Sequence, residues 1–162
     1  MLVLGRIVLA LLGYVAAAAA ASLTIHILLL PQFSLAASQG DEFVAAIMFA
    51  TIPLAAVVIA VLAFAPSALA IFVAEAWAVR GWLYFTIAAA AIGLATAVGY
   101  RNSGIDDFLD IGAEMQIFPP GTSLSSDGFL GIAIAAGIVA GFVYWLIAGR
   151  SSGGWRRSSA GP

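Results

Sequence analysis

Four long apolar runs restrict what this chain can fold into. Each run holds about 20 residues, enough for a helix rising about 1.5 Å per residue to cross a hydrocarbon core about 30 Å thick. The runs are Ile7–Leu30, Phe43–Phe64, Trp82–Tyr100 and Gly128–Ala148. We therefore expect an all-α integral membrane protein, with a four-helix transmembrane bundle forming one domain over residues 1–148.

Composition supports a membrane location and excludes several kinds of chemistry. Hydrophobic residues make up 64% of the 162 residues and charged residues 9%, whereas a soluble domain is about half apolar and a quarter charged. The chain has no cysteine and no lysine, which excludes disulfides, iron–sulfur clusters, thiol nucleophiles and Schiff-base chemistry. A single histidine is too few for bis-histidine haem ligation or a histidine-rich zinc site. We expect no cofactor and no metal.

The basic residues point to a bacterial origin and to the absence of a nucleic-acid partner. All six are arginine, and alanine and glycine are abundant, as in proteins from GC-rich bacterial genomes. A net charge of −2 without a basic cluster argues against nucleic-acid binding. The first apolar run has some features of a signal peptide, but it is longer than the usual signal core of about 7–15 residues. We expect it to be retained as a membrane helix.

The positions of the arginines predict the orientation of the spans. If both termini lie on one side of the membrane, five arginines fall on that side, and only Arg101 falls on the other. The five are Arg6, Arg80, Arg150, Arg156 and Arg157. Arginine and lysine are concentrated in cytoplasmic loops, and tryptophan gathers at the interfaces, where all four tryptophans of this chain would lie on the same side. We expect an inner-membrane protein with both termini in the cytoplasm.

The sequence also allows predictions for three segments outside the four runs. Residues 67–79 are almost wholly apolar, but as a helix they would reach only about 20 Å, too short to span. We expect them to form a connecting helix on the cytoplasmic side, either as the first turns of the third helix or as a re-entrant or partner-binding segment. Pro66 suits the first turn of such a helix. We expect residues 149–162, rich in serine, glycine and arginine, to be a flexible cytoplasmic tail.

The longest loop contains an amphipathic pattern over Ile105–Phe118. Apolar residues recur there at spacings of three and four, which predicts a helix lying along the outer membrane interface. Its acidic face comprises Asp106, Asp107, Asp110 and Glu114. These acids could bind Ca²⁺ or a basic partner, but they lack the spacing of a calcium loop, so a solvated face is the simpler interpretation.

Two ionisable residues in apolar runs are candidate site residues. Glu75 lies in the 67–79 segment, where a carboxylate could serve a proton-coupled transporter or sit at the interface near Arg80 or lipid headgroups. His26 lies in the first run, with Ser22 four residues earlier on the same helix face. His26 could take part in a proton relay, or it could simply form a hydrogen bond to a neighbouring helix.

The fourth run carries a helix-packing motif. Gly137 and Gly141 form a GxxxG element that Ala133 extends by one turn, and small residues at this spacing allow the backbones of membrane helices to approach closely. Residues 16–21 of the first run, all alanine, offer a second smooth surface. We expect these two helices to pack within one chain, or one of them to pack against a partner. Pro53 is expected to kink the second helix.

These features favour a packing role over a catalytic one. The leading hypothesis is a small polytopic membrane protein that acts as an accessory or scaffold subunit of a membrane complex. Its partners would be membrane lipids and other integral membrane subunits, or copies of itself. The alternative is a small oligomeric transporter or channel that uses Glu75, alone or with His26. An enzyme comes third, because no catalytic constellation is visible in the sequence.

The predicted orientation can be tested with single cysteines, since the chain has none. The variants Ser38→Cys, Ser123→Cys and Ser159→Cys place a thiol in the first loop, the longest loop and the tail. A membrane-impermeant thiol reagent applied to intact cells should label the first two and spare the third. Labelling at position 159 but not at position 123 would overturn the orientation.

Overall fold

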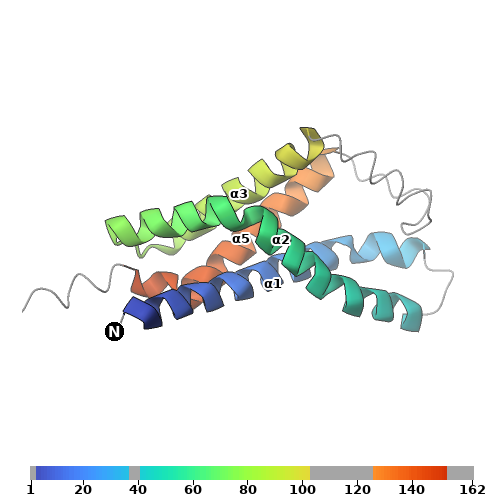
Figure 1. Cartoon of the computed structure of the whole chain (residues 1–162). Helices are drawn as coiled ribbons and strands as arrows, with labels where there is room; N and C mark the ends of the chain where they lie inside the picture. The colour runs from blue at the N-terminus through green and yellow to red at the C-terminus, as the bar shows by residue number, and fades with distance from the viewer. Residues whose placement is uncertain (1–2, 37–40, 103–125, 153–162) are drawn as a thin grey trace, which may run out of the picture.

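The protein is a bundle of long α-helices (Figure 1). The computed structural model describes residues 3–36, 41–102 and 126–152. Their helices are α1 (Val3–Ala36), α2 (Asp41–Trp77), α3 (Trp82–Asn102), α5 (Ser126–Ile147) and the short 3₁₀ helix η1 (Gly149–Ser151). Four of these are long and apolar enough to cross a membrane, with candidate spans Leu4–Leu30, Ala50–Trp77, Trp82–Gly99 and Gly128–Ile147. The expected all-α bundle of four apolar helices is confirmed.

The helices α1, α3 and α5 form the packed part of the bundle. Helix α5 has extensive contacts with α3 and with α1, whereas α2 contacts mainly α1 and touches α3 less. In Figure 1, the start of α1, the α2–α3 connection and the end of α5 lie together at one end of the bundle. We call this the arginine end, because Arg6, Arg80 and Arg150 belong to these three segments.

The backbones of α3 and α5 approach each other at three glycines. A methyl group at Gly137 would overlap the carbonyl oxygen of Ala89, and one at Gly141 would overlap that of Phe85. From the α3 side, a methyl group at Gly93 would overlap the carbonyl oxygen of Ala133. Only glycine fits at these positions. The GxxxG element, extended by Ala133, therefore faces α3 of the same chain.

The alanine-rich part of α1 lies on the other side of α5. A methyl group at Gly13 would lie 3.1 Å from the Cβ atom of Ala148 and 3.3 Å from the ring of Tyr144. Further along α1, Ala17, Ala18 and Ala21 are buried. Small residues on α1 thus let this helix come close to α5, which is the first of the two arrangements expected from the sequence, although the GxxxG element itself meets α3.

Helix α2 differs from the expected division into a span and a separate connecting helix. It continues without a break through Pro53 and Pro66, so residues 67–77 are its last turns and not the start of the third helix. A proline inside a helix removes one hydrogen bond and bends the axis, and in membrane helices neighbouring groups compensate for the loss. Figure 1 shows α2 changing direction along its length. The extended span is longer than about 20 residues, which tilt and bending accommodate.

A tight turn then leads from α2 into α3. Ala78 has a φ of 54°, in the left-handed region that glycine usually occupies. The amide of Val79 donates to the carbonyl of Ala74 at 2.9 Å, and the amide of Ala78 donates to the carbonyl of Glu75 at 3.4 Å. This is the hydrogen-bond pattern of a Schellman motif, which satisfies carbonyls at a helix C-terminus. The turn places Arg80 next to the end of α5.

The chain after α5 also differs from the expected flexible tail, at least where it begins. Gly149 and Ser152 are buried, and η1 packs against Phe85. Residues 149–152 are therefore part of the packed bundle. The remainder of the tail and the expected interfacial helix 105–118, with its acidic face, lie outside the described residues.

The close contact at Gly137 predicts a large effect of adding a side chain there. Gly137→Leu should push α3 away and destabilise the bundle by about 1–3 kcal/mol or more. Ile138→Leu, at a half-exposed neighbouring position, should be close to neutral. Thermal melting in detergent measures the difference, and blue-native gels show the assembly. An unchanged melting temperature for Gly137→Leu, or loss of a larger complex with an intact monomer, would contradict an intramolecular α3 contact.

Candidate functional site

Helices α1 and α2 are joined by polar contacts at four levels, which we call the polar seam. The helices run antiparallel, so early residues of α1 meet late residues of α2. The pairs are Arg6 with Glu75, Tyr14 with the carbonyl of Ala60, Ser22 with the carbonyl of Ile52, and His26 with Thr51. Sequence reasoning singled out His26, Ser22 and Glu75, but it treated Arg6 only as an orientation signal and missed Tyr14 and Thr51.

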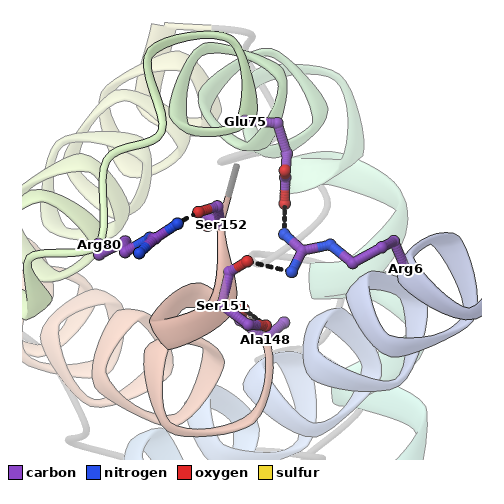
Figure 2. A network of polar contacts seen from close by, with 6 residues as sticks. All are labelled: Arg6, Glu75, Arg80, Ala148, Ser151 and Ser152. Carbon is purple, nitrogen blue, oxygen red and sulfur yellow. Dashed lines mark hydrogen bonds and ion pairs between the residues drawn. The ribbon is translucent and has the colours of Figure 1, made fainter. Parts of the chain in front are cut away.

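At the arginine end, Arg6 binds two parts of the chain at once. Its guanidinium donates to the Glu75 carboxylate and to the carbonyl of Ser151, as Figure 2 shows. Arg6 is 12% exposed and Glu75 is 30% exposed, so the pair is partly shielded from solvent. The Arg6 side chain thus links the start of α1 to the end of α2 and to the residues that follow α5.

Arg80 has a different partner from the one considered from the sequence. Its Nε atom donates to the carbonyl of Ser152 at 2.9 Å, and its own carbonyl accepts from the indole of Trp145 at 2.8 Å. In Figure 2, Arg80 and Arg6 approach the chain at Ser151 and Ser152 from opposite sides. Glu75 pairs with Arg6 because Arg80 lies beyond the turn that ends α2.

The other end of the polar seam is centred on Ser22, which is fully buried. Its hydroxyl donates to the carbonyl of Ile52 at 2.7 Å. His26 Nδ1 lies 2.8 Å from the carbonyl oxygen of Ser22, and its Nε2 lies 3.1 Å from the hydroxyl of Thr51. A carbonyl only accepts, so Nδ1 carries a hydrogen, and a neutral ring can accept from Thr51. His26 is therefore bonded to its own helix and to α2.

The structure does not bring Glu75 and His26 together. Arg6, the partner of Glu75, and His26 are 20 residues apart on α1, which corresponds to about 30 Å along the helix axis. The carboxylate is matched by a cation at one end of the seam, and the imidazole is bonded to neutral groups at the other. The two groups therefore do not form one ionisable site.

A partly open cavity of about 300 Å³, which we call the interior cavity, lies between the four long helices. Its walls are mainly alanine, isoleucine, leucine and phenylalanine, with few hydroxyl groups. Among the described residues that line it, none is acidic, basic or a histidine. This cavity is suited to apolar contents. The sequence did not predict it, because it depends on how little α2 packs against the other helices.

A second hollow of about 480 Å³ runs along the groove between α1 and α2. It shares Tyr14 and Ile71 with the interior cavity and reaches Arg6 and Glu75 at the arginine end. The two spaces are therefore neighbours, and the second has a charged pair at one end. We call the second one the α1–α2 groove.

The polar seam predicts a measurable cost for losing one of its hydrogen bonds. Ser22→Ala should lower the free energy of unfolding by about 0.6–1.7 kcal/mol, the range for interhelical hydrogen bonds in membrane proteins. Thr24→Val is a matched control, because the Thr24 hydroxyl bonds to the carbonyl of Ala20 in its own helix. Denaturation in mixed micelles measures both variants. Equal losses for the two would show that the bond between helices contributes nothing of its own.

Comparison of the chain with protein-family models, with curated proteins and with solved structures found no match.

Proposed function

We propose that this protein is an accessory or scaffold subunit that binds other integral membrane subunits laterally. The observation that carries the proposal is a stripe of small residues on the outward face of α3. Ala91, Ala95 and Gly99 recur every four residues and are exposed. A methyl group at Gly99 would have no atom within 4 Å. We call these three residues the α3 stripe.

Small residues matter on this face because of how helices associate in lipid. The lipid tails are as apolar as the side chains, so close backbone approach and van der Waals packing have to drive association. The inward face of α3 uses Gly93 in this way against α5. The α3 stripe repeats the pattern outward. By contrast, the exposed face of α2 carries large residues such as Val61, Leu69 and Phe72, which suit contact with lipid.

The proposed setting is the bacterial inner membrane, with both termini in the cytoplasm. The arginine end supports this orientation, because it gathers Arg6, Arg80 and Arg150 on one side of the bundle. The start of α1 and the end of α5 lie on that side, and the positive-inside rule favours the cytoplasm for it.

A transporter or channel has less support. That alternative uses Glu75, alone or with His26, and each of these residues already has a bonded partner. They lie at opposite ends of the polar seam, and the interior cavity between the helices is lined mainly by apolar groups. An enzyme would have to draw on the acids of the longest loop, outside the described residues.

The proposal predicts that a bulky side chain on the α3 stripe releases a partner. Affinity purification of the parent in mild detergent should recover another membrane subunit at a fixed ratio. Ala95→Leu should reduce that recovery about tenfold, which corresponds to about 1.4 kcal/mol. Ala19→Leu makes the same change at an exposed position of α1 and should leave recovery unchanged.

Quantitative mass spectrometry of the purified membrane proteins gives the readout, and melting temperature checks the fold. The proposal fails if the parent recovers no membrane subunit at a fixed ratio. It also fails if Ala95→Leu retains the subunit as well as the parent does.

A further inference from the structure

The interior cavity lies at the depth of the hydrocarbon core. Its walls come from all four candidate spans, for example Ala18 of α1, Leu62 of α2, Ala88 of α3 and Ala136 of α5. Whatever fills it is therefore taken from the membrane interior or from water that reaches that depth.

Water does not suit this cavity. A buried water needs about two to four polar partners, and among the described lining residues only Tyr14, Ser67, Thr96 and Tyr144 carry a hydroxyl, two of which already donate to backbone carbonyls. Tyr14 donates to the carbonyl of Ala60, and Thr96 donates to the carbonyl of Ile92 at 2.8 Å. An empty cavity would leave its wall atoms without dispersion partners on one side. Hydrocarbon would provide these dispersion contacts, and lipid tails supply hydrocarbon at this depth.

The α1–α2 groove lies next to the cavity and offers a lipid tail a second apolar space. It begins at Tyr14 and Ile71, which both spaces share, and it ends at Arg6 and Glu75. The opposite charges of this pair offset each other. The other cations of this end include Arg150, which is exposed and lies 5.9 Å from the ring centre of Trp145. With Arg80, this gives the described residues of the arginine end more positive than negative charges, and Arg6 is the cation that lines the groove itself.

We propose that one phospholipid binds within the bundle, with an acyl chain in the interior cavity and the α1–α2 groove and its phosphate at the arginine end. This site is independent of the α3 stripe, which faces outward from another helix. The bound chain would fill the space that α2 leaves open, and it would therefore be an integral part of the packed bundle.

The test uses a phosphatidylglycerol that carries a photoactivatable diazirine near the end of one acyl chain. The protein is reconstituted into vesicles of phosphatidylethanolamine containing this probe, irradiated and mapped by mass spectrometry. Adducts should appear on cavity residues such as Ala18 and Ala88, in addition to outward residues such as Leu12. Adducts confined to outward residues would overturn the proposal, whatever the variants below show.

Filling the cavity gives a second, independent measurement. Ala63→Phe places a ring into the cavity from α2, whereas Ala65→Phe makes the same change on the exposed face of α2. Native mass spectrometry after delipidation should find one phospholipid on the parent and on Ala65→Phe, and at least tenfold less on Ala63→Phe. Equal retention by a folded Ala63→Phe variant, checked by melting, would contradict the proposal.

Discussion

The close approach of the α3 and α5 backbones is the contact on which the rest of the bundle depends. Inside a membrane, apolar side chains gain little by leaving lipid for one another, so helices have to associate through dispersion at short range. Gly93, Gly137 and Gly141 allow the two backbones to come that close, because any larger side chain would overlap a backbone carbonyl of the facing helix. Helix α1 then packs on α5 through Gly13 and a run of buried alanines.

Helix α2 is held in a different way, and this difference shapes the interior. None of the residues in its most apolar window is buried, and its attachment to α1 is a series of hydrogen bonds and one ion pair. Interhelical hydrogen bonds in membranes contribute about 0.6 kcal/mol each on average, so these polar contacts are individually weak. The end of α2 is packed more firmly, because Ala74 is buried against Phe85 and Tyr144. Its position leaves the interior cavity between the helices. The polar seam thus sets both the place of α2 and the space that we assign to a lipid.

Much of this fold follows from the sequence, because span length and apolar composition directly reflect the thickness of a membrane. The sequence also identified Gly137 and Gly141 as a packing surface, but it did not decide between a partner within the chain and one outside it. From the sequence, α2 was predicted as a span followed by a separate connecting helix, because prolines usually mark helix ends and Pro66 comes just before a short apolar segment. In a membrane, a break in the helix would leave backbone hydrogen-bonding groups unpaired in hydrocarbon, and this free-energy cost keeps the helix continuous.

The candidate site was less predictable, because its pairs join residues far apart in the chain. Glu75 was evident as an isolated acid, yet its partner Arg6 is 69 residues away and depends on how α1 crosses α2. The α3 stripe was not recognised either, because alanine is so common in this chain that its spacing gave no signal. Only the packing of α3 against α5 shows which of its alanines face outward.

A double-mutant cycle between Gly93 and Gly137 tests the central contact most directly. In the structure, a methyl group at Gly93 would lie 3.7 Å from the Cα atom of Gly137, so both positions act on one short stretch of interface. Gly93→Ala, Gly137→Ala and the double variant are unfolded in mixed micelles at concentrations where the chain is monomeric. Each single change should destabilise, and the double variant should lose at least about 0.5 kcal/mol less than the sum. Strictly additive losses, or no loss at all, would contradict a direct α3–α5 contact.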